Sequence, residues 1–161
     1  MDAPTLENDA VRLLPLDAGH VDALVAASAE DPDRYRWNVV PQGRDAMADY
    51  VARAVAGREA GHMLPFAVER RSEARLVGST RVARIERWDW PDGHPEHGRT
   101  TPDVCEIGYT WLAASTLRTE VNTNAKLLLL DHAFSAWDVH AVRIRTDARN
   151  VPSCRAIERL G

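Results

Sequence analysis

The chain has 161 residues, 45% of them hydrophobic, which is enough for one domain with a single core. Its 20 basic and 24 acidic residues give a net charge of −4, so the composition holds no surplus of Lys and Arg for nucleic acid. Residues 1–9 lack the blocks of a signal peptide, and no apolar run approaches the roughly 20 residues of a membrane span, so we expect a cytoplasmic protein.

The first third of the chain predicts one strand and two helices. A strand is expected at 10–14, and a helix follows at about 18–30 with apolar residues on one face. An aromatic loop at 35–40 leads to a second amphipathic helix that ends at Gly57. Two helices are therefore expected between the first strand and the next.

The middle of the chain predicts a hairpin and a long loop. Apolar residues alternate at 63–69 and again at 76–85, on either side of a turn at 70–75. This pattern is typical of two antiparallel strands. The segment 88–103 is rich in Pro, Gly and His and is expected to be irregular.

The last third predicts a strand, a helix, a strand and a helix. A β-branched and aromatic strand at 104–112 meets a polar turn at 116–123, which opens into an apolar helix at 125–137. A strand at 141–146 and a helix at 152–160 follow. The first three elements form a βαβ unit, whose strands are expected to be parallel.

The turn before the 125–137 helix is a candidate phosphate site. A strand that feeds a helix through a tight turn directs several backbone N–H groups and the positive end of the helix dipole to one point. The alternative is that Asn122 or Thr123 is only the N-cap of a buried helix, which needs no ligand.

Three segments carry a resemblance to a known family. They read EIGYTWL at 106–112, VNTNAKLLLL at 121–130 and NVPSCRAIERLG at 150–161. Together with the element order, they resemble the GNAT superfamily of acyl-CoA N-acyltransferases, and within it the branch of ribosomal-protein N-terminal (alanine/serine) acetyltransferases. The resemblance implies an α+β fold with a mixed, mostly antiparallel sheet, a βαβ cofactor unit and helices on both faces.

The resemblance also implies a binding site for acetyl-CoA, which serves as co-substrate. The pantetheine arm would bind the strand backbone, and the pyrophosphate would bind the turn at 117–123. Asn150 would contact the arm, and Ser153 would lie near the thioester sulfur. The implied cofactor-binding residues are Ile107, Tyr109, Trp111, Leu117, Arg118, Thr119, Glu120, Val121, Asn122, Thr123, Asn150 and Ser153.

The sequence departs from the family pattern at two places. Leu117, Glu120 and Asn122 stand where the family usually has Arg or Gln and two small residues. Glu120 would repel a pyrophosphate unless its carboxylate points to water. Ile157 stands where many members have a Tyr that acts as general acid, which leaves Ser153 or solvent to meet the thiolate.

Glu106 and Ser153 are the predicted catalytic residues. Glu106 opens the cofactor strand, and partial burial would make its carboxylate a useful base for the acceptor amine, acting directly or through a water. The alternative is a solvated charge at a strand end. Five residues are predicted to wall the acceptor pocket, or else to be core aromatics and their neighbours: Tyr35, Trp37, Asn38, Trp88 and Trp90.

The remaining reactive residues point to no further chemistry. Direct transfer needs no nucleophile, and Cys105 and Cys154 are expected to be buried thiols. His94 and His97 are only two potential ligands in one loop, so no metal site is expected.

The sequence thus predicts one N-acetyltransferase domain over 1–161 that moves an acetyl group directly from acetyl-CoA to a primary amine. The acceptor would be a protein N-terminus or a small amine such as an amino acid, a polyamine or an antibiotic. A catalytically silent acyl-CoA-binding or regulatory module is the alternative on the same fold, and a purely structural α+β protein is another. Neither nucleic acid nor a membrane is an expected partner. The family's last pair of strands is expected beyond Gly161 or from a partner chain, as in a homodimer.

Overall fold

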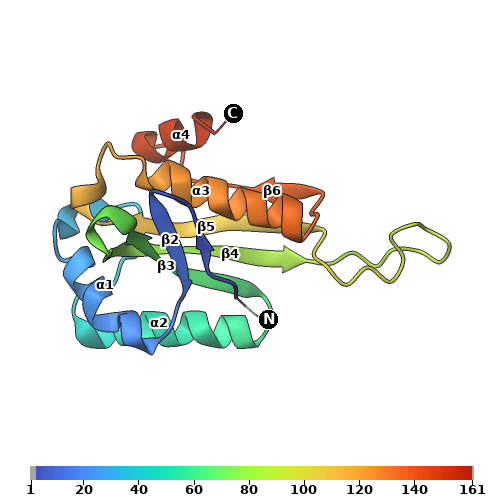
Figure 1. Ribbon diagram of the computed structural model, residues 1–161, viewed down its shortest axis with the longest axis horizontal. Helices are drawn as coiled ribbons and strands as arrows, with labels where there is room; N and C mark the ends of the chain where they lie inside the picture. The colour runs from blue at the N-terminus through green and yellow to red at the C-terminus, as the bar shows by residue number, and fades with distance from the viewer. Residues whose placement is uncertain (1–2, 161) are drawn as a thin grey trace.

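The structure, a computed structural model, describes residues 3–160 as a six-stranded sheet covered by helices (Figure 1). The strands lie side by side in chain order: β1 (Leu6–Glu7), β2 (Val11–Pro15), β3 (Met63–Arg70), β4 (Arg75–Glu86), β5 (Val104–Leu112) and β6 (Ala141–Arg143). Neighbouring strands are antiparallel except β5 and β6, which are parallel. The predicted α+β class and mixed sheet are confirmed.

Within residues 3–160, four α-helices cover the two faces of this sheet. α1 (Val21–Ser28) and α2 (Arg44–Glu59) pack on one face, and α3 (Val121–Asp131) and α4 (Val151–Glu158) lie on the other (Figure 1). Each layer buries apolar side chains against the sheet, such as Met47 of α2 and Leu129 of α3. The hydrophobic effect on these two interfaces holds the layers together. No helix in this part of the chain has the length and apolarity needed to cross a membrane.

Most predicted elements are found within a few residues, and two differences bear on the site. Helix α3 begins at Val121, not at 125, because Val121 and Ala125 both face the core one helical turn apart. It continues through a π-helical turn, His132–Ala136. Strand β6 covers only Ala141–Arg143 of the predicted 141–146. The sequence did not predict β1.

The shortened β6 opens the sheet. β5 and β6 pair only where 104–106 lies beside 141–143. Over 107–112, β5 has no strand along that edge within residues 3–160. The backbone there is free to bind another extended molecule, and the gap between the two strands is the mouth of the cleft described below.

The 87–103 connection between β4 and β5 extends away from the sheet as a long arm (Figure 1). It is irregular, as predicted. Of the two cysteines, Cys105 is buried as expected, and burial raises the pKa of its thiol to about 11. Cys154 was also expected to be buried, but it is only half-buried, like α4 as a whole, which has no fully buried residue. Neither cysteine forms a disulfide.

Candidate functional site

A cleft of about 870 Å³ lies where β5 and β6 separate. Four segments line it: β5 from Ile107 onward, the turn before α3, the loop between α1 and α2, and the chain from Ile144 into α4. A cleft of this size can enclose most of a large cofactor. The parting of two parallel strands therefore creates the main concave site of the described chain.

The lining of this cleft is strongly basic although the whole chain has a net charge of −4. Seven lining residues are Arg or Lys and one is acidic. They are Arg34, Arg36, Arg118, Lys126, Arg145, Arg155 and Arg159, with Asp31. A low-dielectric cleft lined by one sign of charge attracts and concentrates ligands of the other sign. The ligand expected here therefore carries several negative charges.

The turn before α3 contributes both charge and backbone donors. Leu117, Arg118 and Thr119 line the cleft, together with Asn122 and Thr123 from the first turn of α3. The first N–H groups of a helix have no partner inside the helix, so they are available to an anion. Arg118 adopts a left-handed conformation, with φ of 60°, at the centre of this turn.

Two predicted residues of this turn point elsewhere. The Glu120 side chain is exposed and does not line the cleft, so its carboxylate faces water. Val121 is fully buried in the core. The hypothesis that Asn122 or Thr123 is the N-cap is wrong, because Glu120 occupies that position without a side-chain cap. The Thr119 hydroxyl instead accepts from the Val121 N–H at 3.4 Å.

Strand β5 bulges at the centre of the cleft. Ser79 pairs with Trp111 and Arg81 with Gly108, so Tyr109 and Thr110 both lie opposite Thr80. Tyr109 has a φ of 53°, a strained conformation for a residue with a bulky side chain. Its ring is 55% exposed and lies 4.9 Å from the Arg81 guanidinium. The bulge turns this side chain out of the regular alternation of the strand.

A second cavity, of about 450 Å³, meets the cleft at this bulge. It lies beside β3 and β4, and Met63, Ala83, Arg84 and Glu86 are among its lining residues. Tyr109 borders both cavities. Two molecules bound in the two cavities would therefore both contact Tyr109.

Glu106 is a buried residue of β5 that lines neither cavity and is paired with two arginines. Its side chain is 11% exposed, and Oε2 lies 2.6 Å from Nη2 of Arg145 and 3.5 Å from Nε of Arg84. The alternative of a solvated strand-end charge is therefore wrong. Burial is therefore only part of the surroundings of Glu106, since two guanidinium groups lie beside its carboxylate.

The start of α4 brings the two other predicted residues to the cleft. The Asn150 side chain accepts from the Ser153 N–H at 3.3 Å and so caps α4. Both residues line the cleft. Asn150 thus has a structural role, and Ser153 has a hydroxyl directed at no partner assigned within residues 3–160.

The five predicted acceptor residues fall into two separate groups. Tyr35, Trp37 and Asn38 line the cleft, where the Tyr35 hydroxyl donates to the Leu112 carbonyl at 3.2 Å and Asn38 Nδ2 to the Thr110 carbonyl at 3.4 Å. Tyr35 and Asn38 therefore each bind one carbonyl group near the end of β5. Trp88 and Trp90 lie in the 87–103 arm and border neither cavity.

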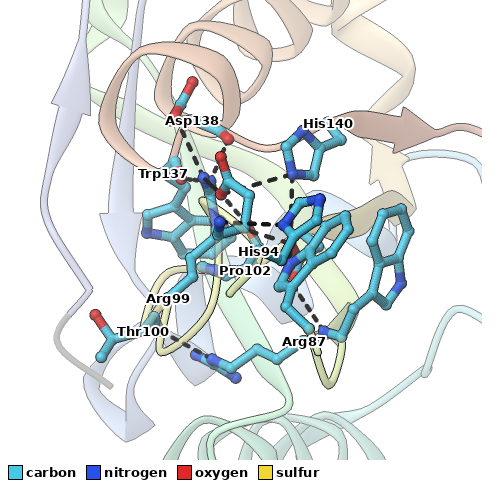
Figure 2. Close-up of polar contacts among 12 residues, drawn as sticks. Arg87, His94, Arg99, Thr100, Pro102, Trp137, Asp138 and His140 are labelled. Atoms are coloured by element: carbon cyan, nitrogen blue, oxygen red, sulfur yellow. Dashed lines mark hydrogen bonds and ion pairs between the residues drawn. The ribbon is translucent and has the colours of Figure 1, made fainter. Parts of the chain in front are cut away.

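The buried carboxylate of Asp103 holds the base of this arm, where His94, Arg99 and His140 lie near one another (Figure 2). It accepts from the Trp88 N–H at 2.7 Å and from the Trp90 indole N–H at 2.9 Å, and His140 Nε2 lies 3.4 Å away. Burial raises the pKa of Asp103, but these hydrogen bonds, with the charges of Arg99 and His140, outweigh it and leave the pKa below its ordinary value. The two tryptophans are thus part of a structural cluster.

The histidines of the arm do not converge on one point. His94 stacks on Trp90, with ring centroids 4.2 Å apart, and His97 Nδ1 lies 2.9 Å from the Trp90 carbonyl oxygen. Across residues 3–160, no three His, Cys, Asp or Glu side chains are grouped so that they could hold a metal ion.

Sequence reasoning missed every basic residue of the cleft except Arg118, and the buried one among those missed is Lys126. The Lys126 side chain comes from α3, is buried, and forms part of the cleft lining. Its Nζ donates a hydrogen bond to the Thr110 hydroxyl at 2.6 Å. The signal was present in the sequence, since Lys126 is its one lysine and precedes four consecutive leucines. A lysine on the core side of an apolar helix is rare.

Comparisons with known proteins agree with this architecture. A family model described as an acetyltransferase (GNAT) domain matches residues 10–161. A GCN5-related N-acetyltransferase from Brucella melitensis is 25% identical, with a TM-score of 0.83, and the match covers 100% of this chain and 68% of that one. No curated protein sequence matches the chain at a significant level.

Two further solved structures share the fold at lower identity. RimJ from Mycobacterium smegmatis, solved with a CoA-disulfide, is 20% identical with a TM-score of 0.74 over 98% of this chain and 73% of that one. An acetyl transferase from Salmonella typhimurium that modifies the N-terminal serine of ribosomal protein L7/L12 is 14% identical, with a TM-score of 0.78 over 97% and 83%.

Proposed function

Because the chain belongs to the GNAT acetyltransferase family, whose members use acetyl-CoA, we propose that it transfers an acetyl group directly from acetyl-CoA to a primary amine. The acceptor is a protein N-terminus or a small amine. One observation carries the proposal of direct transfer: Tyr109 borders both the basic cleft and the second cavity. A donor in one and an acceptor in the other can react without an acyl-enzyme.

The basic cleft suits acetyl-CoA as donor. Its phosphates require cations and backbone donors, and the cleft offers Arg118, Arg155 and Arg159 and the first N–H groups of α3. Its pantetheine arm requires extended backbone, and the free edge of β5 over 107–112 offers it.

The second cavity is the proposed acceptor site. An acceptor amine is mostly protonated at neutral pH, so it must lose a proton before it can attack. We assign this proton to Glu106, whose carboxylate lies on β5, the strand of Tyr109, beside Arg145 and Arg84. Its other oxygen, Oε1, accepts no hydrogen bond assigned within residues 3–160 and can hold a water that relays the proton.

Backbone and hydroxyl groups supply the remaining polar contacts. The strand N–H groups near Tyr109 can donate to the acetyl carbonyl oxygen, where negative charge grows during attack. The Ser153 hydroxyl lines the cleft and can donate to the thiolate that leaves. Acetyl-CoA itself supplies an activated acyl group with a thiolate as the leaving group.

The experiment that tests this function has two parts. Isothermal titration with acetyl-CoA tests the cleft, and the release of CoA thiol is then followed over a panel of peptides, amino acids and polyamines. The proposal predicts saturable binding and amine-dependent thiol release. Binding without release on any amine would favour a silent acyl-CoA-binding module, and the absence of binding at millimolar acetyl-CoA would contradict the assignment of the cleft.

A further inference from the structure

The chain uses arginine at every basic position except one. Of its 20 Lys and Arg residues, 19 are arginines and only Lys126 is a lysine. A guanidinium stays protonated in proteins under all ordinary conditions, whereas an ammonium can lose its proton when it is buried. Among the Lys and Arg side chains, the one that can lose its proton is therefore the one that lies buried in the cleft.

The surroundings of Lys126 favour such an exchange. The residue is 7% exposed, and the Thr110 hydroxyl is the one hydrogen-bond partner of Nζ assigned within residues 3–160. No carboxylate of the described chain lies within 4.0 Å of Nζ. Burial accordingly lowers the pKa of Lys126 to about 8. The charged groups that share the cleft are Asp31, Arg34, Arg36, Arg118, Arg145, Arg155 and Arg159.

Lys126 is linked to the place where the acetyl group would react, and not to the turn where the phosphates would bind. Its hydrogen-bond partner, Thr110, directly follows Tyr109 on the bulge. A donor and an acceptor can react only where the two cavities meet, which is at Tyr109. The turn that offers backbone donors to phosphate is a separate segment, 117–123.

The other acids in the cleft are less suited to give up a proton. The Tyr35 hydroxyl already donates to the Leu112 carbonyl, and burial raises the pKa of this phenol. Tyr109 is more than half exposed, so water competes for its hydroxyl. Lys126 is buried and has two N–H donors left over beside the one that reaches Thr110.

We propose that Lys126 donates a proton to the sulfur of CoA as the acetyl group leaves. The inference rests on the proposed function. The amine nitrogen forms a bond to the acetyl carbon, the carbon–sulfur bond breaks, and its electron pair stays on sulfur. One ammonium proton of Lys126 passes to that sulfur and leaves a neutral amine. A proton from the acetylated amine, reaching solvent and then Lys126, restores the ammonium, so the overall transfer is balanced.

Two substitutions separate proton donation from simple charge. Lys126→Met removes the ammonium at similar length, and Lys126→Arg keeps a charge that cannot be given up. Both variants should lower kcat by about 10²-fold or more, with the Kd of acetyl-CoA changed by less than about threefold. Arg118→Met serves as the matched contrast on the phosphate turn, where Kd should rise and kcat should change little.

A second measurement requires no turnover. Because Lys126 is the one lysine, [15N]lysine labelling of the full chain gives a single side-chain ammonium signal whose pKa can be titrated by NMR. Titration is compared for the free protein, for the CoA complex and for the complex with desulfo-CoA, which lacks the thiol. CoA should shift the titration of Lys126, whereas desulfo-CoA, which has no thiol, should not. The absorbance of the CoA thiolate should also appear at lower pH in the parent complex than in the Lys126→Met complex.

The outcomes distinguish this inference from the proposed function. Full activity of Lys126→Arg with an unchanged pH profile, or equal weakening of CoA and desulfo-CoA in Lys126→Met, would make Lys126 a charge or phosphate contact and overturn the inference alone. A covalent acetyl group on Lys126 in mass spectra would also overturn it. Should the parent acetylate no amine while CoA still shifts the Lys126 titration, the proposed transfer would fail and the contact between Lys126 and sulfur would stand.

Discussion

Replacing Lys126 by methionine should make the protein more stable at neutral pH. Burial without a counter-ion lowers the pKa of Lys126 from 10.5 to about 8. Each pKa unit corresponds to about 1.4 kcal/mol, so the charged form costs the folded state about 3 kcal/mol. Methionine loses the hydrogen bond to Thr110, worth about 1 kcal/mol, while Thr110 and Thr80 keep their hydroxyl contact at 2.8 Å. The net gain at pH 7 is about 2 kcal/mol.

The cost of burying the Lys126 ammonium makes the free energy of unfolding of the parent protein depend on pH. Below pH 8, Lys126 is protonated in both the folded and the unfolded state, and the full penalty is present. Between about pH 8 and 10.5, the unfolded chain binds more protons than the folded protein, so the free energy of unfolding rises with pH. Above pH 10.5 both forms are neutral, and the penalty has gone.

Urea unfolding at several pH values measures this effect directly. Cys105 titrates in the same range with the opposite sign, because burial raises the pKa of its thiol to about 11 and its contribution to stability falls as pH rises. The difference between parent and Lys126→Met cancels this contribution and leaves that of Lys126. A variant less stable than the parent at pH 7, or a difference that is constant from pH 7 to 10.5, would show that the ammonium is not an uncompensated charge.

Four other substitutions and one control test the site and the arm. Glu106→Gln cannot accept the amine proton, so kcat should fall by about 10² to 10⁴ with acetyl-CoA affinity retained, and full activity with an intact pH profile would exclude Glu106 as the base. Ser153→Ala should lower kcat by only about tenfold in the thiol-release assay, because water can replace the hydroxyl. Glu120→Gly should leave the Kd of acetyl-CoA unchanged or improved in calorimetry, since the carboxylate faces water, and a tenfold loss would show a role in binding. Asp103→Ala should lower the free energy of unfolding in urea by about 3 kcal/mol, because the N–H donors of Trp88 and Trp90 lose their acceptor. Asp92→Ala, at a fully exposed side chain of the same arm, should change it by almost nothing.

The sequence predicted those elements whose pattern is set by one buried face. The bounds of β5 agree with the predicted 104–112, because apolar and β-branched residues alternate there up to a polar turn on one side and an irregular loop on the other. The start of α3 was placed too late because Asn122, Thr123 and Asn124 read as a turn. These polar residues are nevertheless common in a first helical turn, where the backbone N–H groups need solvent or a ligand.

The residues of the site were less predictable because they come from distant segments. Pattern reasoning identifies a strand or a helix but not which loops fold over it, so Trp88 and Trp90 could not be told apart from Tyr35 and Trp37. The structure separates the two pairs: Asp103 binds the first pair at the base of the arm, and the second lines the cleft. A bulge is equally hidden, since one residue too many in a strand leaves no mark in its hydrophobic pattern.

The strain at Tyr109 is an argument that the bulge serves the site and not the sheet. The residue before it is Gly108, which could adopt a left-handed conformation at no steric cost, yet the positive φ falls on Tyr109. Such a conformation costs a bulky residue of order 1 kcal/mol or more. A regular strand would avoid that cost, but it would place Tyr109 in strict alternation with its neighbours. The bulge instead lets the Tyr109 side chain border both cavities, while Thr110, one residue on, holds Lys126. The strained residue is therefore the one through which the donor cleft, the acceptor cavity and the buried lysine are brought together.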